Sequence, residues 1–124
     1  MKMLSLALAG ALVSASASAA QPGAEVEYPR GALGYEALLS NDLSAAEDQL
    51  LASRDSSWND PAWLINIGQV MARTGRTGQA AEMFRRAMNA EDLEIVLADG
   101  TVMTSRRAAA IALKRLRPLQ LSSR

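Results

Sequence analysis

The feature that most constrains the fold is a recurrence of residue types 34 positions apart in the middle of the chain. Gly34 recurs as Gly68, and Asn41 recurs as Gly75. Asn and Gly are the residue types that most readily adopt a positive φ where a helix ends. Apolar residues recur at the same offset, as Leu33 and Ile67, Ala46 and Ala80, and Leu50 and Phe84. Apolar residues at helical spacing and a period of this length are typical of stacked helix-turn-helix units, the architecture of a helical solenoid.

The second of these units resembles the tetratricopeptide repeat, whose pattern is W-x2-L-G-x2-Y, then A-x3-F, then P. It matches the pattern at Ile67-Gly68, at Ala80 and Phe84, and at the small Ala87. It departs from the pattern with Leu64 for Trp, Met71 for Tyr and Asp92 for the closing Pro. The first unit matches more loosely, with Leu33-Gly34, Ala46, Leu50 and Ser53. The resemblance covers about residues 29–92 and implies two helix-turn-helix repeats.

Gly68 lies inside a predicted helix, where glycine costs about 1 kcal/mol relative to alanine. Repeats of this kind place small residues where two helices cross closely, so we expect Gly68 and Ala80 to allow the backbones to approach. Phe84 is then expected to fill the space towards the following helix. The matching Gly34 predicts the same close packing in the first unit.

The first 20 residues have the features of a secretory signal peptide. Lys2 gives a basic start, an apolar run continues to Val13, and Ala17-Ser18-Ala19 fits the small-x-small cleavage pattern. The apolar run is shorter than the roughly 20 residues that a membrane-spanning helix needs. We therefore expect residues 1–20 to be removed on export, leaving a periplasmic or secreted protein without a transmembrane span.

The remaining segments are predicted to flank the two repeats at residues 31–92. Residues 21–30 contain Pro and Gly and predict an extended lead-in. In residues 93–104, apolar and β-branched residues flank Asp99-Gly100, which predicts a short β-hairpin, with a helix as the alternative. Residues 105–117 predict a capping helix that Thr104 or Ser105 begins and Pro118 ends, before a tail at 118–124. The predicted fold class is mainly α: two tetratricopeptide-like repeats in a short solenoid, then the hairpin and the C-terminal helix.

Composition argues against most catalytic chemistry. The chain has no Cys and no His, which leaves no thiol or imidazole nucleophile and no usual zinc ligand set. It also has no Gly-x-Ser-x-Gly, Ser-x-x-Lys or phosphate-binding glycine motif. We expect a protein without enzyme activity, cofactor or metal. The alternative is a carboxylate-based enzyme of the cell envelope, with Glu36, Asp42, Glu82 and Asp99 as its candidate residues.

The resemblance implies that a partner binds the concave surface made by the first helix of each repeat. Carried over to this chain, that surface is expected to include Tyr35, Leu38, Leu39, Ile65, Asn66, Gln69, Ala72 and Arg73. Asn66 is the residue expected to hold a peptide backbone. The function expected from this surface is that of a non-catalytic exported adaptor or assembly factor, which binds a protein or peptide.

A second candidate surface is basic. From Thr104 onward the sequence has six basic residues and no acidic one. A predicted basic face consists of Arg106, Arg107, Lys114 and Arg115, and its alternative ligands are an acidic partner or an anionic surface. Nucleic acid is disfavoured by the predicted export and by the lack of interleaved aromatic residues. Self-association, acidic end to basic end, is a further alternative.

Overall fold

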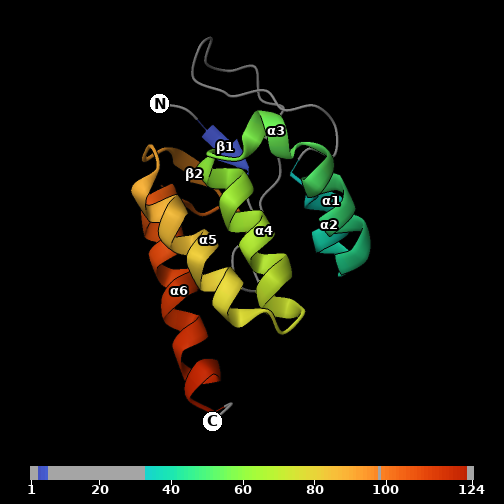
Figure 1. Ribbon diagram of the computed structural model, residues 1–124. Coiled ribbons are helices and arrows are strands. Elements are labelled where there is room, and N and C mark those ends of the chain that lie inside the picture. Colours follow the sequence, from blue (N-terminus) through green and yellow to red (C-terminus); the bar gives the residue numbers. More distant parts are fainter. Residues whose placement is uncertain (1–2, 6–32, 98, 123–124) are drawn as a thin grey trace.

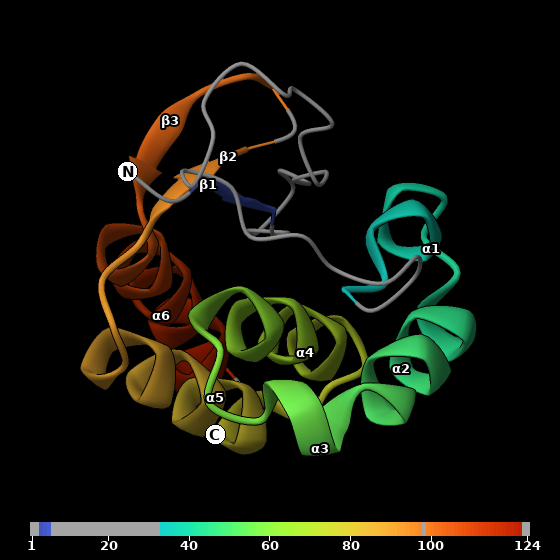
Figure 2. The ribbon, with the colours of Figure 1, turned by 90° about the horizontal axis from the view of Figure 1, so that it is seen from above.

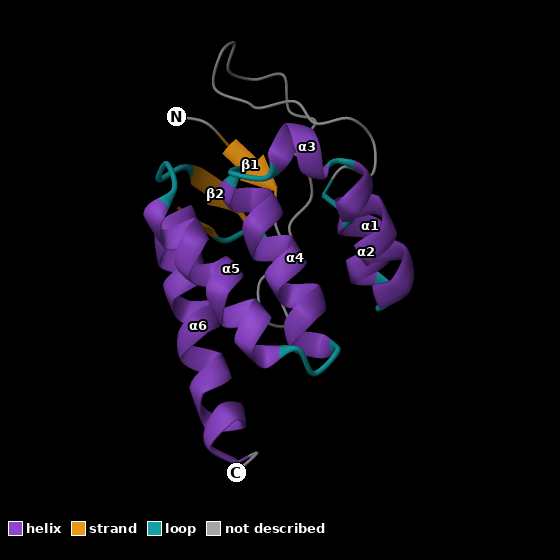
Figure 3. Cartoon of the chain, in the orientation of Figure 1, coloured by secondary structure: helices purple, strands orange, loops and turns teal. Residues whose placement is uncertain are grey.

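The computed structural model describes residues 3–5, 33–97 and 99–122 of the chain (Figure 1). In chain order the elements are β1 (Met3–Ser5), α1 (Tyr35–Leu39), α2 (Leu43–Ala52), α3 (Arg54–Ser57), α4 (Pro61–Arg73), α5 (Thr77–Asn89), β2 (Glu94–Val96), β3 (Val102–Thr104) and α6 (Ser105–Ser122). This part of the chain is mainly helical, and it contains the hairpin and the C-terminal helix that the sequence predicts. Figure 3 shows the strands at the end of the molecule where α4 and α6 begin.

The two helix pairs, α1–α2 and α4–α5, turn in the same way. Asn41 (φ 57°) follows α1 and Gly75 (φ 81°) follows α4, and both have a left-handed backbone. The sequence predicts this conformation at both positions, since Asn and Gly tolerate it best. The recurrence in sequence therefore marks a recurring turn.

The hydrogen bonds around these two turns also recur 34 residues apart. In each turn, a hydroxyl just after the helix donates to the carbonyl four residues earlier, and the amide two residues further on donates to a carbonyl in the last helical turn. The bonds, each 2.8 Å long, are Ser40 Oγ to Glu36 O and Asp42 N to Ala37 O in the first turn, and Thr74 Oγ1 to Val70 O and Arg76 N to Met71 O in the second. The two pairs thus share their backbone geometry as well as their residue types.

Gly68 lies on the side of α4 that packs against α5. A Cβ added to Gly68 would be 2.5 Å from Cε1 of Phe84, far inside the 3.5–4.0 Å that two carbon atoms prefer. Phe84 is 1% exposed. Its ring therefore packs on α4 of its own pair. The expectation that Phe84 fills space towards the following helix stays a prediction.

Gly34 also marks a close approach, but in a different backbone setting. A Cβ there would be 3.1 Å from the Ala46 carbonyl oxygen and 3.3 Å from Leu50 Cγ. Gly34 is left-handed (φ 63°) and precedes α1 rather than lying inside it. Helix α1 is therefore shorter than its counterpart α4, because a left-handed residue cannot continue a right-handed helix.

Helix α4 is the centre of the fold and lies between the α1–α2 pair and α5 (Figure 2). Its first turn is fixed by Asp60, whose carboxylate accepts from the amides of Ala62 (2.8 Å) and Trp63 (3.4 Å), with Pro61 at the first helical position. Every residue from Pro61 to Val70 is buried. The Trp63 indole donates to the Leu50 carbonyl at 2.8 Å and so joins α4 to the first pair.

The hairpin turns at the predicted Asp99-Gly100. β2 and β3 are antiparallel with Ile95 opposite Met103. Gly100 has φ 87°, and the Asp99 carboxylate accepts from the Thr101 amide at 2.9 Å. A strand that the sequence analysis did not predict, β1, adds to the other edge of β2 in parallel, with Leu4 opposite Ile95. The sheet order is therefore β1-β2-β3.

Helix α6 packs along α5 and also contacts α4 (Figures 1 and 2). The Thr104 hydroxyl accepts from the Arg107 amide at 3.3 Å and caps its first turn, as predicted. The helix continues to Ser122, so the predicted end at Pro118 and the separate tail at 118–124 are wrong. A proline removes one helical hydrogen bond and strains the preceding turn, but the turns on either side can still form.

The predicted signal peptide and lead-in fall mostly outside the described residues. Of residues 1–32, the structure describes Met3–Ser5 alone. Export and cleavage therefore stay predictions. Within the described residues, no helix is both long and apolar enough to span a membrane.

Candidate partner-binding surfaces

Three polar residues of α4 form a strip along one side of the helix. Asn66, Gln69 and Arg73 are three and four residues apart, the spacing that places side chains on one helical face. Asn66 Nδ2 donates to the Leu33 carbonyl at 2.8 Å, and Arg73 Nη1 donates to the Leu38 carbonyl at 3.4 Å. The two ends of this α4 strip therefore face the segment that contains α1.

Gln69, in the middle of the α4 strip, has an unpaired donor. Its side chain is 2% exposed, and its Nε2 has no hydrogen-bond partner among the residues that the structure describes. An unsatisfied buried polar group costs about 1–3 kcal/mol. Such groups are rare in folded proteins, so this one needs an explanation.

The residues predicted for the concave surface differ widely in exposure. Leu38 and Ile65 are 1% and 0% exposed and belong to the hydrophobic core. Asn66 is 0% exposed. Leu39 is 52% exposed, whereas Tyr35, Ala72 and Arg73 are half-buried. Burial lowers the pKa of the Arg73 guanidinium, which nevertheless stays charged at any physiological pH.

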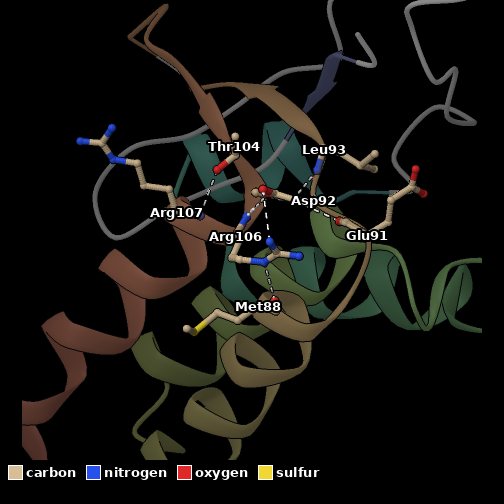
Figure 4. Close-up of polar contacts among 8 residues, drawn as sticks. Met88, Glu91, Asp92, Leu93, Thr104, Arg106 and Arg107 are labelled. Carbon is tan, nitrogen blue, oxygen red and sulfur yellow. Dashed lines mark hydrogen bonds and ion pairs between the residues drawn. The ribbon is translucent and has the colours of Figure 1, made fainter.

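The predicted basic face of α6 divides into one structural residue and three exposed ones. Arg106 Nε donates to the Met88 carbonyl at 3.0 Å, and its Nη1 is 3.7 Å from Asp92 Oδ2 (Figure 4). The Arg106 amide also donates to Asp92 Oδ1 at 2.9 Å. These bonds join the end of α5 to the start of α6, where a carboxylate is favoured by the helix dipole. The side chains of Arg107, Lys114 and Arg115 are exposed.

An ion pair between Glu47 and Arg76 joins α2 to the start of α5. The carboxylate and the guanidinium meet at two points, one of them 3.3 Å between Arg76 Nη1 and Glu47 Oε2. The hydrogen bond from Arg76 holds the pKa of the Glu47 carboxyl below its ordinary value. The same bond raises the pKa of Arg76. The pair is about one-third exposed, so its role is to connect the two helix pairs rather than to react.

The four carboxylates proposed for an alternative enzyme lie on separate elements. Asp42 caps α2 by accepting from the Ala45 amide at 3.1 Å. Asp99 accepts from Thr101 in the hairpin turn, and this bond lowers the pKa of its carboxyl. Glu36 and Glu82 are exposed on α1 and α5. The described residues also contain no group of three or more acidic side chains able to hold a metal ion.

One surface feature was missed by the sequence analysis. An open cavity of about 500 Å³ lies where α3, the start of α4 and α5 meet. It is lined by Arg54, Asp55, Trp58, Trp63 and Arg86. Trp58 is 57% exposed and Trp63 is 4% exposed. Nothing in the spacing of these residues predicts the cavity, because Arg86 comes from a helix 28 positions after Trp58.

Comparison with models of protein families, with curated proteins and with solved structures finds no match to this chain.

Proposed function

We propose that this chain is a non-catalytic exported interaction module, in which two tetratricopeptide-like helix pairs hold a protein or peptide along the α4 strip. The equivalent hydrogen bonds of the two turns, 34 residues apart, support the repeat. The close contacts of Gly34 with Leu50 and of Gly68 with Phe84 support it as well, because both pairs are at corresponding positions of the two units.

The observation that carries the proposal is the unpaired Nε2 of Gln69. Asn66 and Arg73, on either side of it, each donate to a carbonyl oxygen. The strip is therefore built to bind carbonyl groups, and Gln69 is the member whose amide donor is unused. A partner's backbone carbonyl would satisfy that donor.

The form that meets the partner is the exported one. Gln69 is 2% exposed in the 124-residue chain. Export, as proposed, removes residues 1–20 of that chain. Binding along the α4 strip is therefore a property of the mature protein in this proposal.

Affinity capture with a matched variant tests this function. The full chain, with a tag at its C-terminus, is expressed in a cell that exports it and is captured from the cell envelope. We expect a co-purifying protein that is lost when Gln69→Leu is the bait, while helicity by circular dichroism stays the same. The same proteins captured in equal amounts by both baits would refute binding through Gln69.

A second candidate is binding of an anionic surface by α6. It is favoured by the exposure of Arg107, Lys114 and Arg115 on a helix that carries no acidic residue. The variant that tests it changes these three residues to Gln and keeps Arg106, because Arg106 bonds to α5. Binding to vesicles that contain anionic lipid should fall in this variant, and unchanged binding would rule this candidate out.

A further inference from the structure

The cavity at α3 presents a fixed, exposed aromatic ring. The Trp58 side chain is 57% exposed. The Arg86 guanidinium carbon is 5.8 Å from the centre of its ring, and Arg86 Nη2 donates to the Trp58 carbonyl at 2.8 Å. One arginine therefore holds both the backbone and the indole of Trp58. An aromatic group held in place before binding loses little conformational entropy when a ligand arrives.

The inner wall of the cavity is apolar. Trp63 lines it and is 4% exposed, and its indole N–H already donates to the Leu50 carbonyl at 2.8 Å. Trp63 therefore offers the cavity an aromatic surface and no free donor. With Trp58, it provides two indoles against which an aromatic group can pack.

The rim of the cavity is positively charged. Two guanidinium groups, from Arg54 and Arg86, and one carboxylate, from Asp55, line it. Arg86 is engaged with Trp58. Arg54 is exposed, and among the described residues its side chain makes no hydrogen bond or ion pair. It is therefore available to bind a carboxylate, which a guanidinium accommodates with two parallel hydrogen bonds.

We propose that this cavity is a second binding site, which takes a partner segment carrying an aromatic side chain next to a carboxylate. The aromatic ring packs against Trp58, and the carboxylate pairs with Arg54. Asp55 opposes the carboxylate and so weakens binding. None of α3, Trp63 and Arg86 belongs to the α4 strip. A negative result for this site would therefore leave the proposed function untouched, and the reverse also holds.

The test uses ¹⁵N-labelled full-length protein and short blocked peptides as probes. The probe is acetyl-Phe-Asp-amide. Its matched controls are acetyl-Phe-Asn-amide, which lacks the charge, and acetyl-Ala-Asp-amide, which lacks the ring. The indole N–H signals of Trp58 and Trp63, assigned with Trp58→Phe, report binding directly. We expect the Trp58 signal to shift with saturation for the Phe-Asp peptide alone.

Variants of exposed residues then test the charges. Arg54→Gln should weaken binding of the Phe-Asp peptide about tenfold or more, whereas Asp55→Asn should strengthen it. Arg85→Gln is the control, since Arg85 is exposed on α5 but does not line the cavity. The absence of a saturable shift would overturn the proposal. So would equal binding of the Phe-Asn peptide, or an equal loss in Arg54→Gln and Arg85→Gln, which would indicate a general charge effect.

Discussion

Replacing Gly68 with alanine has two opposing effects on stability: a gain in helix propensity and a cost from packing the added Cβ. Alanine is better than glycine inside a helix by about 1 kcal/mol, so on propensity alone Gly68→Ala stabilises. The new Cβ, however, would lie 2.5, 2.9 and 3.0 Å from three ring atoms of Phe84. Phe84 is 1% exposed, so the ring has little space into which to move. Overpacking of this kind costs about 1–3 kcal/mol, which cancels or exceeds the propensity gain.

A double-mutant cycle with Phe84→Leu separates the two effects. Leucine is the residue at the corresponding position of the first pair, Leu50. In the Phe84→Leu background the ring atoms that meet the Cβ are gone, so Gly68→Ala should stabilise by up to about 1 kcal/mol. In the wild-type background it should be neutral or destabilising, which gives a coupling energy of about 1–3 kcal/mol.

Urea unfolding followed by circular dichroism gives the free energy of unfolding of the four proteins in the cycle: the wild type, the two single variants and the double variant. The variants should share one m-value, so that changes in midpoint report changes in stability. If Gly68→Ala stabilises the wild-type protein as much as it stabilises Phe84→Leu, the close packing of the Phe84 ring on Gly68 is refuted.

Three other outcomes follow from particular contacts. Arg106→Gln should lower the free energy of unfolding by about 1 kcal/mol, because Arg106 bonds to the Met88 carbonyl, whereas Arg107→Gln should change it little; equal effects in urea melts would contradict this. Because the pKa of Glu47 is lowered in the folded state, its charge stabilises the fold above its unfolded pKa, and this gain is lost as the pH falls through the folded pKa. Glu47→Gln should therefore lose less unfolding free energy than the wild-type protein as the pH falls below about 4.5. The difference should be less than about 1 kcal/mol, because the pair is partly exposed. An identical pH profile for the two proteins would count against the ion pair. Removing residues 1–20 should speed hydrogen exchange of the β2 amides (Glu94–Val96), which pair with β1 in the full chain, and leave α4 unchanged; equal β2 exchange would show that this pairing does not protect β2.

The sequence predicted those parts of the fold that depend on local chemistry. Asn41 and Gly75 end helices because they tolerate a left-handed backbone, and Asp99-Gly100 makes a hairpin turn for a similar reason. Gly34 shows the limit of such reasoning. Its residue type matched Gly68, but its left-handed conformation depends on how the chain enters α1.

The candidate surfaces depend more on which segments meet than on residue types. The resemblance placed Ile65 on the concave surface, but it did not reveal that Ile65 would be completely buried. Arg106 was predicted as part of a basic face, and its bond to Met88 could not be foreseen because it requires the position of α5. The cavity at Trp58 was missed for the same reason, since its arginine comes from a distant helix.

The most direct test of the α4 strip as a binding surface compares the stability of two variants, Gln69→Leu and Asn66→Leu. Asn66 donates to the Leu33 carbonyl, so Asn66→Leu should lower the free energy of unfolding by about 1–3 kcal/mol. Gln69 leaves its buried Nε2 unpaired, so Gln69→Leu should leave stability unchanged or raise it. A loss of stability in Gln69→Leu as large as in Asn66→Leu would show that the Gln69 amide supports the fold itself, and would contradict its assignment to a partner.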